Sequence, residues 1–223
     1  MSRRNIVSKL NRKASLLCAA IAAPALLLST GLSAQSGPER TNTFSGTLTP
    51  LNDSGVNGTF TIEQRGQGEI TVTINATGLE VIDQIHPGHI HGLEGKQEAV
   101  CPTLAQDSDG DGFVELAEGL STYGPIIINL GDVDPDNDGV VNYSMTFNLN
   151  NSPAFADGKD KDDLFPIELR EIVLHGKTLQ AGEGSNGGEA DGTAGYKTVL
   201  PVACGEVKMD ERGRSGPKTV EIK

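Results

Sequence analysis

Apolar and polar residues alternate along several short segments of this chain. The clearest example is 70–76, Ile-Thr-Val-Thr-Ile-Asn-Ala, and a second is 141–149, where Val, Tyr, Met, Phe and Leu occupy every other position. Because successive side chains of a strand point to opposite faces, this pattern predicts strands with one buried face. The same strand character is found at 43–48, 58–62, 172–174 and 199–200, and the continuous apolar run 125–130 predicts a strand buried on both faces.

Clusters of Gly, Asn and Asp separate these segments, and helical periodicity is almost absent. We expect at most short helical turns around 116–118 and 163–165. Many short strands joined by turn residues are typical of an antiparallel β-sandwich or barrel. The pattern therefore predicts an all-β domain.

Two irregular stretches, 92–124 and the Gly-rich 177–196, are long for connections inside a compact domain. Loops of that length are usually functional or mobile. The polar C-terminal segment 208–223 is expected to be a flexible tail, although 219–222 has the character of an edge strand.

The first 34 residues have the features of an export signal. A basic start that includes Arg3 and Arg4 precedes the apolar run 16–28, and Leu32-Ser33-Ala34 provides a cleavage site. The apolar run is too short for a membrane span. We expect an exported protein, periplasmic or extracellular, and the arginine pair leaves open whether it follows the general or the twin-arginine route.

Removal of 1–34 makes the chain more acidic, because 13 basic residues then face 30 acidic ones, a net charge of −17. Such a chain should repel nucleic acid and anionic membranes and should attract metal cations. About 190 residues remain, enough for one domain. They contain two cysteines, Cys101 and Cys204, which in an exported chain most simply form one disulfide, with free thiols as the alternative.

Residues 107–118, Asp-Ser-Asp-Gly-Asp-Gly-Phe-Val-Glu-Leu-Ala-Glu, match the twelve-residue EF-hand calcium loop at every defining position. Gly112 permits the sharp turn, and the entering helix is missing. We expect an isolated calcium-binding loop that rigidifies a long connection. Its oxygen ligands would come from Asp107, Asp109, Asp111, the Phe113 carbonyl, Glu115 and Glu118.

Residues 134–139 repeat the first half of that spacing, but the twelfth position is Met145, which has no oxygen to close a calcium shell. A β-turn is the favoured interpretation of this segment, and a weak second calcium site is the alternative.

Three of the four histidines fall within six residues, at His86, His89 and His91. In a strand, His89 and His91 would project to the same side, and His86 is close enough to add a third nitrogen. His175 lies in a separate apolar stretch. A group of imidazoles with no thiolate partner favours copper or zinc, whereas the alternative is that the histidines only form hydrogen bonds.

The order of these residues resembles the Cu/Zn superoxide dismutase family, which implies a Greek-key β-sandwich or barrel. In that family a His-x-His strand pair and a later strand histidine bind copper, which implies His89, His91 and His175 as ligands. The resemblance also implies a disulfide between Cys101 and Cys204, the latter in an Ala-Cys-Gly motif. Residues 43–92, which end in His-Ile-His-Gly, also resemble the CHRD domain of chordin and many exported bacterial proteins. Together the resemblances cover about 42–207.

The chain departs from the dismutase pattern in three ways. No histidine lies between His91 and His175, so the bridging ligand and the zinc-site histidines are absent, and the acidic loop occupies that region. Pro201 stands where the dismutases have an arginine that guides the anion. Lys197 is the nearest basic residue to that position, and it is a possible anion guide.

Three functions fit these observations. One is a copper-only superoxide dismutase that uses His89, His91 and His175, with His86 as a possible fourth ligand. The second is a non-catalytic metal-binding domain that holds calcium and a copper-type ion. The third is an adhesion or matrix module of CHRD type. The missing zinc ligands and guiding arginine favour the second.

Overall fold

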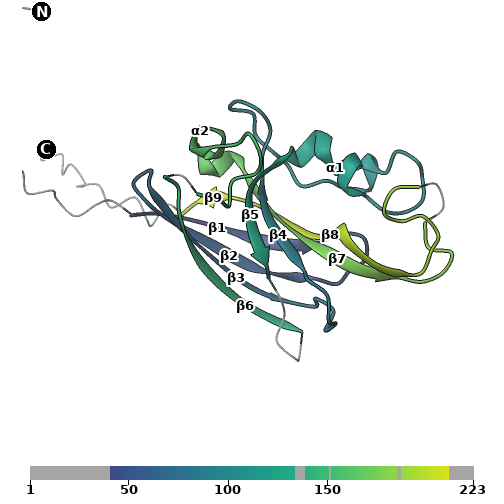
Figure 1. Cartoon of the computed structure of the whole chain (residues 1–223). Helices are drawn as coiled ribbons and strands as arrows, with labels where there is room; N and C mark the ends of the chain where they lie inside the picture. The colour runs from purple at the N-terminus through teal and green to yellow at the C-terminus, as the bar shows by residue number, and fades with distance from the viewer. Residues whose placement is uncertain (1–40, 134–138, 151, 185–186, 211–223) are drawn as a thin grey trace, which may run out of the picture. The chain divides into compact units, whose positions relative to one another are not determined.

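The computed structural model describes residues 41–133, 139–150, 152–184 and 187–210 (Figure 1). Every strand pair within this part of the chain is antiparallel. The strands are β1 (Thr41–Pro50), β2 (Asn57–Arg65), β3 (Glu69–Thr77), β4 (Pro87–His91), β5 (Ile126–Asp132), β6 (Val140–Asn148), β7 (Glu171–Leu179), β8 (Gly195–Glu206) and β9 (Lys208–Met209). The helices are α1 (Leu116–Tyr123) and α2 (Lys161–Leu164), with 3-10 turns η1 (Leu104–Gln106) and η2 (Ile167–Leu169).

The strands follow one another in the order β5-β4-β7-β8-β1-β2-β3-β6, and β9 pairs with β1. Strand β1 joins the two halves, because Phe44 pairs with Ile62 of β2 and Thr49 pairs with Cys204 of β8. The chain crosses between the halves, so that β3 pairs with β6 and β4 pairs with β7. Figure 1 shows β1, β2, β3 and β6 as one layer and β4, β5, β7 and β8 as the facing layer.

Strands β5 and β6 lie at the two ends of this order, and a side chain bridges the seam between them. The Tyr143 hydroxyl on β6 donates a hydrogen bond of 2.7 Å to the Leu130 carbonyl of β5. Burial raises the pKa of Tyr143 to about 12, so the hydroxyl keeps its proton at neutral pH. The result is a nearly closed barrel-like sheet, which confirms the predicted all-β sandwich or barrel.

The main core lies between the two layers, and the alternating positions of the sequence supply it. On β3 the side chains of Ile70, Val72 and Ile74 are fully buried, while Thr71 and Thr73 lie on the outer face and bond to β6 hydroxyls. On β5, Ile127 and Ile128 are both buried, as predicted for the run 125–130. Residues 154–156 bond to the outer edge of this strand.

Several boundaries differ from the predicted ones. Strands β7 and β8 are longer than the predicted 172–174 and 199–200, so the Gly-rich connection between them is 180–194. Polar residues such as Lys177 and Thr178 continue the β7 ladder because their backbone pairs with β8. Strand β9 extends the sheet into the predicted tail, and α1 is longer than the expected turn. The predicted export signal, residues 134–138 of the predicted 134–139 turn, and the segment 219–222 lie outside the described residues.

Truncation of a core side chain on β4 should cost far more than the same kind of change on the surface. Ile90 is fully buried in the main core, so we expect Ile90→Ala to lower the free energy of unfolding by about 2–5 kcal/mol. Val81 is 54% exposed, and Val81→Ala should change it by less than about 0.5 kcal/mol. Urea unfolding followed by circular dichroism measures both, and equal losses would contradict the assignment of the core.

Candidate metal centre

The pairing of β4 with β7 brings three histidines together. His89 pairs with Val173 and His91 with Glu171, and His175 follows two residues after Val173. Paired residues of antiparallel strands share a face, so the three imidazoles project from one side of the sheet. Ile90 and Ile172 point the other way into the main core. The histidine group therefore lies on the outer face of the β4–β7 layer.

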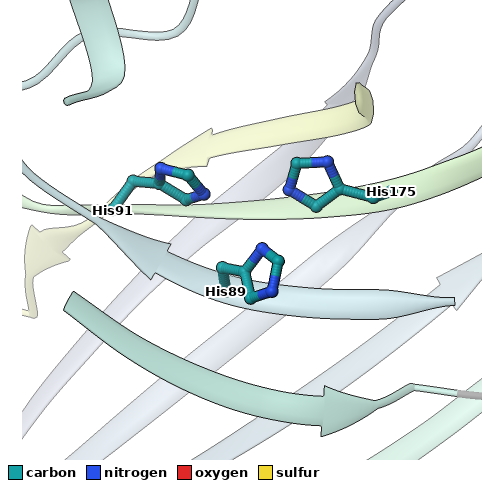
Figure 2. A group of neighbouring side chains, drawn as sticks. All are labelled: His89, His91 and His175. Carbon is teal, nitrogen blue, oxygen red and sulfur yellow. The ribbon is translucent and has the colours of Figure 1, made fainter. Parts of the chain in front are cut away.

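The rings of His89, His91 and His175 converge, as Figure 2 shows. Ring centroids are 4.8 Å apart for His89 and His175, 5.6 Å for His89 and His91, and 5.9 Å for His91 and His175. One ring nitrogen from each residue lies within 4.8 Å of the other two. Because a metal–nitrogen bond is about 2 Å long, small side-chain shifts would let one ion contact all three.

In the His91 and His175 rings, a hydrogen bond to one nitrogen leaves the other nitrogen free. Nδ1 of His91 lies 2.8 Å from the Gly124 carbonyl, and Nδ1 of His175 lies 2.8 Å from the Val199 carbonyl. A carbonyl oxygen only accepts, so each Nδ1 carries the hydrogen and each Nε2 presents a lone pair. Both Nε2 atoms and Nδ1 of His89 are buried and have no hydrogen-bond partner. Three unpaired buried nitrogens are the arrangement that a metal ion satisfies.

Burial also keeps these imidazoles neutral. Desolvation lowers the pKa of His89 and of His91 to about 4, and it lowers the pKa of His175 well below its ordinary value. His89 is 8% exposed, the most of the three. A neutral imidazole is the form that binds metal, so protons do not compete for this site near neutral pH.

The structure does not bring His86 into this group. Its ring is fully buried, with Nε2 2.9 Å from the Glu80 carbonyl and Nδ1 3.2 Å from both the His175 carbonyl and the Tyr196 hydroxyl. Both nitrogens are engaged in these contacts. His86 therefore supports the β7 backbone that carries His175.

Helix α1 covers the histidine group from one side. The Tyr123 ring is fully buried with its centroid 4.6 Å from that of His91, and the Tyr123 hydroxyl donates to the Leu116 carbonyl at 2.7 Å. Gly124 follows with a φ of 75°, and a Cβ there would overlap the Gly92 carbonyl. Sequence reasoning missed Tyr123, Gly124 and Val199. A glycine after a helix is a recognisable end signal, whereas nothing in the sequence marks Val199 as the partner of His175.

The acidic loop forms a second group of ligand atoms. Oxygens of Asp107, Asp109 and Glu118 lie within 4.8 Å of one another. The Asp107 carboxylate accepts hydrogen bonds from the N–H groups of Gly110 and Gly112 at 2.7 and 2.9 Å, which curl the loop around it. The 3-10 turn η1 stands where an EF-hand has its entering helix, and α1 takes the place of the exiting one.

Two other predicted ligands of the loop, Asp111 and Glu115, are arranged differently. Oδ2 of Asp111 is buried without a hydrogen-bond partner, while its Oδ1 accepts from the Phe113 N–H at 2.8 Å. Oε1 of Glu115 instead accepts from the Ala190 N–H at 2.6 Å, so this carboxylate holds the Gly-rich connection. Burial and neighbouring carboxylates raise the pKa of Asp111 and of Glu115. A cation would relieve that repulsion.

Lys197, the predicted anion guide, is already paired. Its ammonium lies 2.7 Å from the Asp191 carboxylate and 3.0 Å from the Thr193 hydroxyl, which lowers the pKa of Asp191. The predicted Cys101–Cys204 disulfide is present. In the described part of the chain, no helix is long and apolar enough to cross a membrane.

In the metal-free protein, the buried histidines should favour the folded state less as the pH falls below neutral. An unfolded histidine takes up a proton near pH 6.5, whereas folded His89 and His91 stay neutral down to about pH 4. The unfolded state thus binds more protons between these values. The contribution of His89 and His91 to the free energy of unfolding should fall through this window as pH falls, by at most about 1.4 kcal/mol per pH unit for each histidine, while the raised pKa of Glu171 contributes with the opposite sign.

Urea unfolding at pH 7, 5.5 and 4.5 with a chelator would measure this dependence. The variant His91→Asn keeps a donor near the position of Nδ1 for the Gly124 carbonyl but cannot titrate, so its pH slope should be shallower than that of the wild type. Equal slopes would contradict the assignment of His91 as a buried neutral imidazole.

Comparisons with known proteins do not assign the chain to a family. No family model and no curated protein matches it. Among solved structures, a crystal structure analysis of the clock protein EA4 aligns with a TM-score of 0.40 and 16% identity, over 78% of this chain and 98% of that one. A similarity this distant carries no argument about function, so the function must be argued from the geometry of the site.

Proposed function

We propose that this protein is an exported metal-binding β-sandwich whose histidine site, formed by His89, His91 and His175, holds a copper-type ion. The observation that carries the proposal is the set of three buried imidazole nitrogens with no hydrogen-bond partner. An unsatisfied buried polar atom costs about 1–3 kcal/mol, and a bound ion would remove that cost at all three positions.

The donor set favours a particular class of metal. Three neutral nitrogens suit Cu, Zn, Fe or Ni, and they suit Ca and Mg poorly, because those ions prefer oxygen. The cysteines are joined in a disulfide, so they contribute no thiolate. Strong imidazole affinity and the absence of sulfur ligands favour Cu(II), with Zn(II) next. When bound, the ion supplies Lewis acidity or, in the case of copper, one-electron chemistry.

The acidic loop is proposed as a calcium site that holds the long connection 92–124 in place. Asp107, Asp109 and Glu118 supply the convergent oxygens, and the unpartnered Oδ2 of Asp111 adds a fourth. The side chain of Glu115 bonds to Ala190, so a water molecule is proposed in its place, as EF-hand loops often use at the ninth position.

A copper-only superoxide dismutase is the second candidate. The order of His89, His91 and His175 and the Cys101–Cys204 disulfide support it. The non-catalytic proposal stands first, because the Lys197 ammonium is neutralised by Asp191 and the chain is strongly acidic. Both features weaken attraction of a superoxide anion.

Copper titration of the metal-free protein tests the histidine site. Isothermal calorimetry should show one Cu(II) ion bound per chain, and His175→Gln should weaken binding by more than about 100-fold, because loss of a direct ligand exceeds loss of its supporting partner. The comparison is His86→Gln, which should weaken binding clearly less than His175→Gln does, because His86 supports the β7 backbone and offers no free nitrogen, while its circular dichroism spectrum confirms folding. Equal weakening by both changes would contradict the three-histidine assignment.

A superoxide decay assay on the copper-loaded protein separates the two candidates. Activity no greater than that of an equal concentration of free copper supports the binding role. Activity well above it that is lost in His175→Gln would replace the binding role with the enzymatic one.

Calcium should raise the melting temperature of the protein. At a free concentration 100 times the Kd, a ligand that binds only the folded state adds about 2.7 kcal/mol of stability. Glu118→Gln should abolish most of the increase, while Glu98→Gln, an exposed change outside the loop, should keep it. An unchanged increase in Glu118→Gln would contradict the calcium proposal.

A further inference from the structure

The disulfide and a buried glutamate meet beside the histidine group. Cys204 on β8 pairs with Val173 on β7, and Glu171 lies two residues before Val173 on the same face. Oε2 of Glu171 is 3.0 Å from Sγ of Cys204. Val173, Cys204 and Tyr123 pack together in one small cluster with Cys101 at its edge.

The chemistry of this contact identifies its donor. A sulfur atom in a disulfide carries no hydrogen, so the proton between Oε2 and Sγ belongs to the Glu171 carboxyl, which must be neutral. Glu171 is fully buried, and its Oε1 has no hydrogen-bond partner. Burial of an ionised carboxylate with no cationic partner is costly, which agrees with the neutral form.

The two sulfur atoms differ in access. Cys101 is half-buried, whereas Cys204 is fully buried. Both line a groove of about 600 Å³, together with Ser45, Thr47, Thr49 and Lys208. Cys101 is therefore the more accessible of the two residues to a small thiolate in this groove, and attack on its sulfur would make Cys204 the leaving sulfur. The leaving sulfur is the one beside the carboxyl proton.

We propose that Cys101, Cys204 and Glu171 form a thiol–disulfide exchange site for a small dithiol, with Glu171 as the proton donor to Cys204. A thiolate of the dithiol attacks Sγ of Cys101, forming a new S–S bond and breaking the Cys101–Cys204 bond. The electron pair of the broken bond goes to Sγ of Cys204, which takes the proton from Glu171 and leaves a carboxylate.

The second half of the exchange needs no further reagent. The remaining thiolate of the dithiol attacks its own sulfur in the mixed disulfide and releases the Cys101 thiolate, which takes a proton from water. The dithiol is oxidised to a disulfide by two electrons, and the protein gains two thiols. The carboxylate of Glu171 regains its proton from solvent. The exchange requires no metal, so its test does not depend on the proposed histidine site.

Because Glu171 protonates the leaving thiolate, replacing it should lower the rate at which the Cys101–Cys204 disulfide is reduced. In the metal-free protein, Glu171→Gln should slow reduction by dithiothreitol at pH 7 by at least about 10-fold. General acid catalysis typically contributes about 10²–10⁴-fold to a rate. Glu98→Gln should react at the wild-type rate. The mass increase of the reduced chain follows the reaction, and a solvent deuterium isotope effect should be present in the wild type and lost in Glu171→Gln. Equal rates and equal isotope effects in all three proteins would overturn the role of Glu171.

A second measurement uses the unaltered protein and so does not depend on how a variant folds. Reaction with a monothiol, glutathione, should trap the mixed disulfide on Cys101, and peptide mass mapping locates it. A mixed disulfide on Cys204, or no reaction under native conditions, would overturn the proposal.

Discussion

The register between β4 and β7 is the constraint on which the candidate metal centre depends. It places His89 opposite Val173 and His91 opposite Glu171, so that His175 falls diagonally beside His89. A shift of β4 by one residue would turn His89 and His91 into the main core and Ile90 out of it, while His175 would stay on the outer face. The burial of Ile90 therefore fixes the register, and the register fixes the site.

The outer face of the β4–β7 layer carries several polar side chains although it is buried. Three neutral imidazoles and one neutral carboxyl lie on it, and Tyr123 of α1 packs against His91. Each imidazole keeps its lone pair at the cost of an unsatisfied hydrogen bond in the metal-free state. Proteins retain such groups where they serve a ligand or a reaction. The metal and thiol–disulfide proposals both rest on this one face, and they use different atoms of it.

The covering loops are held by buried polar side chains. Arg170 is fully buried and donates to the carbonyls of Leu164, Leu93 and Gly95, which anchors the start of the 92–124 connection. The Asn52 amide bonds to both backbone groups of Val114, as a neighbouring strand would. Helix α1 then joins the acidic loop, through Glu118, to the histidine group, through Tyr123. A rigid connection of this kind keeps the ligand atoms preorganised.

Much of the fold could be predicted from the sequence, because strand alternation is a local property. The segments around Ile70–Ala76 and Val141–Leu149 show their buried face in the order of residues alone. The spacing of His89 and His91 likewise implies a shared face, and the spacing of Asp107, Asp109 and Glu118 implies convergent oxygens. By itself, the sequence therefore determined which elements form and which residue types were available for metal binding.

The tertiary structure decided which of those residues meet. It separated His86 from the other histidines by engaging both of its nitrogens, and it turned Glu115 toward Ala190. It paired Lys197 with Asp191 and set Glu171 against the disulfide. These outcomes depend on contacts between residues that are distant along the chain, such as Glu171 and Cys204 or His175 and Val199. Local pattern cannot encode them, because pairing register and burial set the protonation and hydrogen bonding of each group.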